Sequence, residues 1–151
     1  MSVQHEQVAD WMSRELIIGF PHMLLEEVYH LMIQHNVRRI PILSPPHEEQ
    51  EAVLMGIVTY GDVRGAIPST VPSVGVWEKH YLHDHLTAEK FMSRDPVTIA
   101  ETASIGQAAH KMLENRISGL PVVNEQHQLV GIITESDIFR MVIQQEWGEK
   151  E

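Results

Sequence analysis

The stretch LVGIITESDIFR, from Leu129 to Arg140, decides the fold of this chain. It is a short apolar run that ends abruptly in two small oxygen-bearing residues three apart, Thr134 and Asp137. Almost the same pattern, LMGIVTYGDVRG, occupies Leu54 to Gly65, so that the threonine and the acid recur 75 residues apart. A pattern of this length written twice indicates an internal repeat, which must be recognised before any other feature is interpreted.

The repeat extends well beyond these two stretches. Met12-Ser13-Arg14 returns 80 residues later as Met92-Ser93-Arg94, and Ile40-Pro41-Ile42 returns as Leu120-Pro121-Val122. Beyond the proline the spacing falls to 75, because the first copy holds five extra residues in the polar loop SPPHEEQEA. Two copies of about 60 residues therefore fill nearly the whole chain.

Helical spacing is clearest in the second copy. Ser104 stands three residues before Gln107, as in a capping box, and the residues that follow have the apolar periodicity of a helix. The helix face consists of Ile105, Ala108, Ala109, Met112 and Leu113. In the first copy the corresponding face is Leu25, Val28, Tyr29 and Met32, and Leu24 replaces the capping serine.

Extended segments surround this helix. Pro96 to Ile99 predicts a short extended run after an Asp-Pro break. Leu120–Val123 and Leu129–Ile133 predict two strands joined by the polar turn 124–128, and a second helix begins near Thr134. Each copy thus reads strand, helix, strand, strand, helix. This order predicts an α+β fold with small mixed sheets packed by helices.

The expected boundaries follow from the repeat. Residues 1–66 form the first copy, 67–87 a linker whose second part could be helical, 88–144 the second copy, and 145–151 a C-terminal tail. A unit of about 60 residues is only marginally able to bury a core, so we expect the two copies to pack together.

Composition excludes several classes of protein. The 43% of hydrophobic residues suit a globular domain, and no apolar run approaches the length of a membrane span. The amino terminus lacks a signal-peptide pattern, so a cytoplasmic location is expected, and the absence of cysteine excludes disulfides. The net charge of −10 disfavours nucleic-acid binding, which depends on neutralising phosphates.

The Thr-x-x-Asp motif has two interpretations. At the start of a helix, a threonine and an acid three residues later can simply cap the helix. The same groups also suit a nucleotide, because N–H groups at a helix start favour phosphate and a carboxylate accepts hydrogen bonds from a ribose diol. The chemistry of the motif alone does not choose between them.

The order of the motifs resembles the cystathionine-beta-synthase (CBS) domain, which occurs as a tandem pair. The resemblance rests on ISGLPVV followed by LVGIITESDIF, and it covers Val8 to Gly65 and Ala88 to Met141. It implies a pseudo-twofold module whose clefts between repeats hold AMP, ADP, ATP or S-adenosylmethionine. The sequence does not decide whether Mg²⁺ accompanies the ligand.

The resemblance also implies the roles of individual residues. Asp62 with Thr59, and Asp137 with Thr134, would hold the ribose and lie near the phosphate. The base would rest among residues of the opposite repeat, from its first strand and from the two positions before its proline strand. These are Ile17, Val37 and Arg38 in the first copy, and Val97, Ile117 and Ser118 in the second. The apolar members of this set can equally belong to the core.

Basic residues distinguish the two copies. Arg38-Arg39 precedes the first proline strand, where the second copy has Ser118-Gly119. Because arginine offers planar donors suited to phosphate, the first cleft is expected to hold a phosphorylated ligand more tightly. A solvated basic pair at a turn is the alternative. Arg38 could also face the other cleft, which would narrow the difference.

We therefore expect a regulatory module that binds an adenosine compound, signals to an unidentified protein partner and forms a homodimer. The alternative is a ligand-free dimerisation or scaffolding module whose Thr-x-x-Asp motifs act only as caps. No triad, Walker loop or HExxH motif indicates an enzyme. His80, His83, His85 and Asp84 could suggest a metal site, but neither helical nor strand spacing puts all three histidines on one face.

Overall fold

The computed structural model describes residues 6–47, 51–66 and 86–148. The chain divides into two compact units that do not follow the order of the sequence repeats. One unit is Ile17–Pro96, here called the Thr59 unit, and the other combines Met1–Leu16 with Val97–Glu151 and is called the Thr134 unit. Residues 6–16 of the first repeat therefore pack with the second repeat, and residues 86–96 of the second repeat pack with the first.

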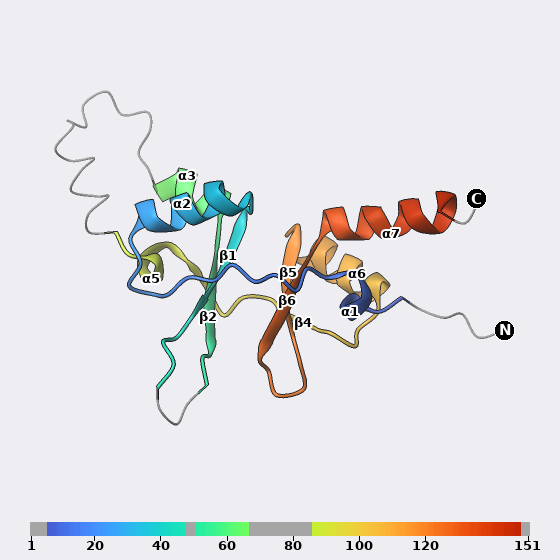
Figure 1. The fold of residues 1–151 in the computed structure, drawn as a ribbon, viewed down its shortest axis with the longest axis horizontal. Helices are drawn as coiled ribbons and strands as arrows, with labels where there is room; N and C mark the ends of the chain where they lie inside the picture. Colours follow the sequence, from blue (N-terminus) through green and yellow to red (C-terminus); the bar gives the residue numbers. More distant parts are fainter. Residues whose placement is uncertain (1–5, 48–50, 67–85, 149–151) are drawn as a thin grey trace. The chain divides into compact units, whose positions relative to one another are not determined.

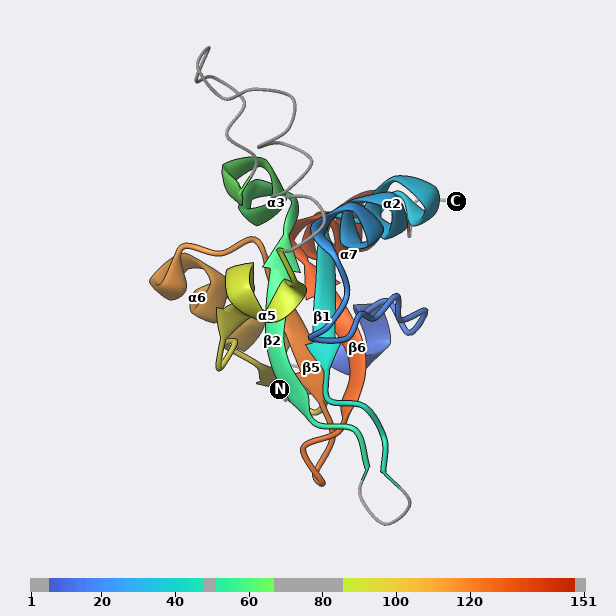
Figure 2. The same cartoon turned by 90° about the vertical axis from the view of Figure 1, so that its left-hand side faces the viewer.

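The Thr59 unit is built on a three-stranded antiparallel sheet in the order β1-β2-β3. Figure 2 shows β1 and β2 running side by side, with α5 near β2. The strands are β1 (Arg39–Leu43), β2 (Leu54–Thr59) and β3 (Ser93–Arg94), and the helices are α2 (Leu25–His35), α3 (Tyr60–Ala66) and α5 (Ala88–Phe91). Helices α2 and α3 contact each other, and each also contacts one strand of the hairpin.

The core of the Thr59 unit lies between this hairpin and the helices. Val28 and Met32 of α2 are buried against Ile40 and Ile42 of β1, and Val63 of α3 completes the cluster. The period of α2 explains the arrangement, because residues four apart on a helix face the same way. Tyr29, which the sequence placed on that face, is 36% exposed.

The Thr134 unit repeats this plan (Figure 1). Its sheet has the order β4-β5-β6, with β4 parallel to β5 and β5 antiparallel to β6. The strands are β4 (Ile99–Ala100), β5 (Gly119–Val123) and β6 (Leu129–Thr134), and the helices are α1 (Val8–Trp11), α6 (Ile105–Asn115) and α7 (Glu135–Trp147). Val8, Met112, Leu120 and Ile133 are among its buried residues.

The predicted capping box of α6 is present in the structure. Gln107 donates its backbone N–H to Ser104 Oγ at 3.1 Å, and Ser104 donates its own N–H to Gln107 Oε1 at 2.9 Å. In α2 only half of the box forms, because Leu24 has no acceptor and Glu27 Oε1 receives the Leu24 N–H at 3.4 Å. Helix α6 is therefore better capped than α2.

The N-terminal segment joins the sheet of the second repeat. Ser13 bridges Ile132 of β6, and in the other unit Ser93 pairs with Ile57 of β2 at the equivalent place. Likewise Gln7 bridges Ser104, while Leu24 bridges Thr87. Each unit thus has the same two contacts, and the segments paired in each contact lie far apart in the sequence.

A glycine makes this approach possible in each unit. A Cβ placed on Gly131 would lie 2.6 Å from Met12 Sδ and 2.8 Å from the Ser13 carbonyl oxygen. A Cβ on Gly56 would lie 2.7 Å from both Met92 Sδ and the Ser93 carbonyl oxygen. The repeated Met-Ser-Arg triplet and the repeated glycine are therefore parts of one packing arrangement.

Most of the predicted elements are present, with differences at their ends. The extended run before α6 forms β4 at Ile99–Ala100, whereas the first copy has only a bridge between Gly19 and Ile42. Leu113 is 81% exposed, although the sequence placed it on the helix face. Helix α7 runs to Trp147 and so includes the first residues of the predicted tail. Most of the predicted linker lies outside the described residues.

Candidate adenosine-binding corners

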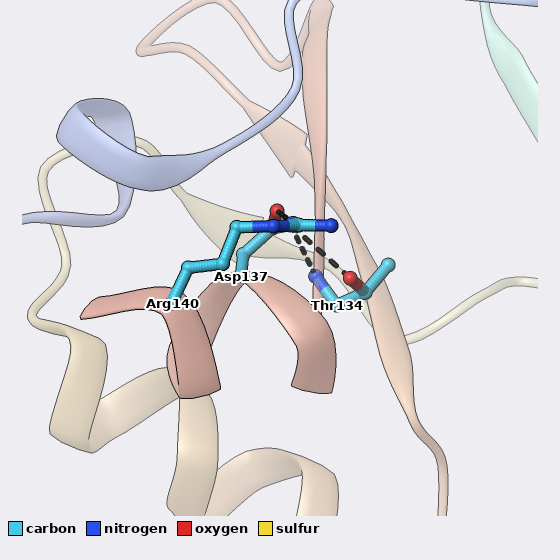
Figure 3. Close-up of polar contacts among 3 residues, drawn as sticks. All are labelled: Thr134, Asp137 and Arg140. Atoms are coloured by element: carbon cyan, nitrogen blue, oxygen red, sulfur yellow. Dashed lines mark hydrogen bonds and ion pairs between the residues drawn. The ribbon is translucent and has the colours of Figure 1, made fainter. Parts of the chain in front are cut away.

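The Thr134 corner lies where β6 ends and α7 begins, and it consists of Thr134, Asp137 and Arg140 (Figure 3). Asp137 Oδ2 accepts the Thr134 backbone N–H at 2.9 Å and the Thr134 hydroxyl at 3.2 Å. Its other oxygen, Oδ1, accepts from Arg140 NH1 at 2.9 Å. The Asp137 side chain is only 12% exposed, so this carboxylate is both buried and engaged on each of its oxygens.

The Thr59 corner, formed by Thr59 and Asp62, occupies the equivalent turn from β2 into α3. Asp62 Oδ2 accepts the Thr59 backbone N–H at 2.8 Å, and Thr59 Oγ1 accepts the Asp62 backbone N–H at 3.1 Å. Within the described ranges, Asp62 Oδ1 has no hydrogen-bond partner. The Thr59 hydroxyl accepts here, which leaves its proton available for a further bond.

The two corners therefore both show the capping geometry. In both, the acid accepts the backbone N–H of the threonine; the Thr59 hydroxyl also accepts the Asp62 N–H, whereas the Thr134 hydroxyl donates to the Asp137 carboxylate. The two carboxylates differ in remaining capacity, because a carboxylate offers about four acceptor sites and the described residues donate one bond to Asp62 but three to Asp137. Capping and ligand binding are compatible wherever an acceptor is left over.

The residues before each proline strand lie beside their own corner. Arg38 accepts the Tyr60 N–H on its carbonyl oxygen at 2.8 Å, and Ser118 accepts the Glu135 N–H at 3.0 Å. Arg38 is exposed and Arg39 half-buried, whereas Ser118 is half-buried and Gly119 buried. Each of these pairs is thereby tied to the first residue of the neighbouring helix.

The four apolar candidate residues are half-buried. Ile17 and Val37 are partly buried against the core of the Thr59 unit, and Val97 and Ile117 against the core of the Thr134 unit. Each therefore contributes to its core and still exposes part of its surface. Partial exposure leaves an apolar surface that a ligand could cover.

Arg140 is a site residue that the sequence analysis missed. Its side chain is 68% exposed and forms an ion pair with Asp137. The equivalent position in the first copy is Gly65, around which no heavy atom lies within 4 Å of a Cβ position. The acid and the base three residues apart on a helix were a readable signal, because such residues face each other.

Other features of the described chain lie outside the two corners. A hollow of about 880 Å³ on the Thr134 unit is lined by residues of α6 and α7 that include His110 and Met141, and by none of the predicted site residues. Among the residues that the structure describes there is no group of metal-ligating side chains and no helix able to cross a membrane. The candidate histidines 80, 83 and 85, with Asp84, fall outside the described ranges.

The family comparison agrees with the repeat. The CBS domain model matches residues 8–69 and 88–144, which are the two segments that carry the corners. The chain belongs to the CBS domain family. The predicted tandem pair and its α+β fold are thereby confirmed.

Several CBS-containing proteins are similar over most of the chain. The CBS domain pair of protein MJ0100, solved with 5′-methylthioadenosine and S-adenosyl-L-methionine, is 28% identical, and the match covers 94% of this chain and 99% of that one at a TM-score of 0.74. The structure of MJ1225 from Methanocaldococcus jannaschii is also 28% identical, over 92% of this chain and 48% of that one, at a TM-score of 0.75.

Several curated relatives are enzymes. Homoserine O-acetyltransferase of Methanohalophilus mahii is 33% identical over 138 residues, which are 91% of this chain but 25% of that protein. The chain spans less than half the length of this relative and of MJ1225. The similarity therefore concerns the CBS portion and does not carry over acetyl transfer.

Proposed function

We propose that this CBS pair binds an adenosine-containing small molecule at its Thr-x-x-Asp corners and passes the bound state to a protein partner. The observation that carries the proposal is Oδ1 of Asp62, which accepts no hydrogen bond from the described residues, beside a threonine hydroxyl that retains a proton to donate. A carboxylate oxygen without a partner can accept from a ribose hydroxyl. The 28% identical MJ0100 pair, solved with two adenosine compounds, supports this choice of ligand class.

Phosphate recognition is the second part of the proposal. AMP, ADP and ATP suit the Thr59 corner because Arg38 lies against the start of α3 and Arg39 is its neighbour in the chain. Arginine binds phosphate oxygens through two parallel hydrogen bonds and stays charged at neutral pH. S-adenosylmethionine, which lacks phosphate, would depend on the carboxylate and on apolar contacts to its base.

Thermal unfolding with added ligands tests the proposal. A ligand at 100 times its dissociation constant should stabilise the folded chain by about 2.7 kcal/mol. We expect AMP, ADP, ATP or S-adenosylmethionine to raise the unfolding temperature of the parent protein, and Asp62→Ala to reduce that rise. Stabilisation by none of the four would contradict ligand binding and leave the scaffolding function, in which both corners act only as caps.

Signalling would follow from differential affinity. A ligand changes the geometry of a protein only if it binds one arrangement more tightly than another. The proposed module needs no catalytic group and no bound metal, and it would act in the cytoplasm on a protein that the chain itself does not identify.

A homodimer is the assembly that we propose. Apolar side chains remain exposed on three helices: Ile33 of α2 is 60% exposed, Leu113 of α6 is 81% exposed, and Phe139, Ile143 and Trp147 lie one turn apart on α7. Scattered exposed apolar residues are ordinary, but a stripe along one helix favours a partner surface. Light scattering at micromolar concentration should give twice the mass of the chain, and a monomer would contradict this part of the proposal.

A further inference from the structure

Arg140 forms an ion pair with Asp137 at the start of α7 and keeps donors for a further partner. The ion pair joins a side chain that is 68% exposed to one that is 12% exposed. Solvent-exposed ion pairs contribute little to stability, typically about 1 kcal/mol or less. The bond to Asp137 Oδ1 uses one of the five N–H donors of the guanidinium, so most of its donors are left for another acceptor.

The two units place their cations at different positions. The Thr59 unit has Arg38 and Arg39 on the strand side of its corner and Gly65 on the helix side. The Thr134 unit has Ser118 and Gly119 on the strand side and Arg140 on the helix side. Each unit therefore has an arginine beside its threonine and acid, supplied from opposite sides of the turn.

We propose that Arg140 is the phosphate-recognising residue of the Thr134 corner. The inference rests on the proposed function, since it assumes that Asp137 holds the ribose of an adenosine ligand. The carboxylate keeps the guanidinium in place before the ligand arrives, and a planar guanidinium can bond a carboxylate and a phosphate through different N–H groups. The corner then selects phosphorylated adenosine over neutral adenosine, and it disfavours a cationic sulfonium compound.

This proposal changes the expected relation between the two corners. The strand-side arginines alone would give the Thr59 corner all of the phosphate affinity. With Arg140 counted, both corners recognise phosphate, and the advantage of the Thr59 corner becomes smaller. Because Arg140 also bonds Asp137 Oδ1, a ribose hydroxyl must use the acceptor site that remains on this carboxylate, whether or not the ligand carries a phosphate.

The test uses AMP and adenosine as matched probes in an Asp62→Ala background, which isolates the Thr134 corner. Calorimetric titration should show that Arg140→Gln lowers AMP affinity roughly 10- to 150-fold, the range for a lost hydrogen bond to a charged group. Adenosine affinity should stay the same or rise. Gln retains length and polarity, so the comparison isolates the loss of charge.

Two outcomes would overturn the inference while leaving the proposed function intact. An equal fall for AMP and adenosine would mean that Arg140 only positions Asp137, and unchanged affinity for both would mean that it contacts neither ligand. The proposed function itself fails at this corner if Asp62→Ala and the Asp62→Ala, Asp137→Ala double variant bind AMP equally. Absence of AMP binding to the parent protein would reject both.

The reciprocal substitution provides an independent arm. Gly65 has open space where a side chain would begin, and its backbone is not in the left-handed region, so Gly65→Arg fits without strain. In an Asp137→Ala background it should raise the ratio of AMP affinity to adenosine affinity at the Thr59 corner, and Gly65→Gln should not. An unchanged ratio would show that the helix-side position does not reach the phosphate.

Discussion

The Thr59 and Thr134 corners have the same backbone and different charges. In both, an acid accepts the backbone N–H of the threonine three residues earlier, at 2.8 Å and 2.9 Å. They differ in what reaches the second carboxylate oxygen, which is Arg140 for Asp137 and no described residue for Asp62. The comparison teaches that a duplicated unit can preserve the contacts that fold it while the groups that select a ligand change position.

The largest loss of stability is expected at Gly131 and Gly56, where the two units pack in the same way. Gly131→Ala and Gly56→Ala would each place a Cβ less than 3 Å from a backbone oxygen that cannot move aside easily. Overpacking of this kind costs about 1–3 kcal/mol, and we expect about 2 kcal/mol or more in each unit. Denaturant unfolding measures both values.

Gly65→Ala is the matched control, because nothing lies within 4 Å of its Cβ position and it sits in a helix. It should leave stability unchanged or raise it by up to about 1 kcal/mol. Free energies of unfolding that are the same for all three alanine variants would contradict the close approach of the Met-Ser segments to these strands.

The next largest loss of stability is expected to differ between the Thr134 and Thr59 corners. Asp137→Ala removes the acceptor for Thr134 and for Arg140, whereas Asp62→Ala removes a single capping bond. Loss of a cap costs about 1 kcal/mol, and we expect roughly that value for Asp62→Ala and about 2 kcal/mol for Asp137→Ala. Urea unfolding of the two variants checks the order, and a larger loss for Asp62→Ala would reverse the comparison.

A smaller difference is expected between the capped ends of α6 and α2. Ser104→Ala should lower the free energy of unfolding by about 1 kcal/mol, because it leaves the Gln107 N–H without its acceptor. Glu27→Ala removes only the long 3.4 Å bond to the Leu24 N–H, so a few tenths of a kcal/mol are expected. Equal losses would show that α2 has a better cap than its bonds indicate.

The smallest stability effect concerns Arg140. Because its ion pair is largely solvent-exposed on the arginine side, Arg140→Gln should change the free energy of unfolding by about 0.5 kcal/mol or less. Thermal unfolding without ligand checks this value. A loss above about 1 kcal/mol would mean that the pair has a structural role. The affinity changes measured for Arg140→Gln would then include an effect of lower stability.

The sequence predicted the local elements well because their signals are local. Helix α6 follows from Ser104, Gln107 and a helical apolar period, and the hairpin β5–β6 follows from two apolar runs around a polar turn. Both corners could be located because Thr-x-x-Asp recurs in register with the glycine of the preceding strand.

The packing of each repeat's N-terminal segment against the other repeat could not be predicted in the same way. Met12-Ser13 could pack against either Gly56 or Gly131, because both glycines have the same sequence context. A local sequence pattern does not distinguish these two equivalent partners, and in the structure the segment packs against Gly131. The choice is made by tertiary packing. Exposure of Leu113 also depends on packing, because an apolar period does not show how wide a stripe the neighbouring strands cover.

The most direct measurement of the central claim is a calorimetric titration of AMP into the parent protein, Asp62→Ala, Asp137→Ala and the double variant. Each single substitution should weaken binding at its own corner roughly 10- to 150-fold, and the double variant should lose specific binding while circular dichroism shows it folded. A folded double variant that binds AMP as tightly as the parent would contradict the account and would leave both Thr-x-x-Asp motifs as helix caps.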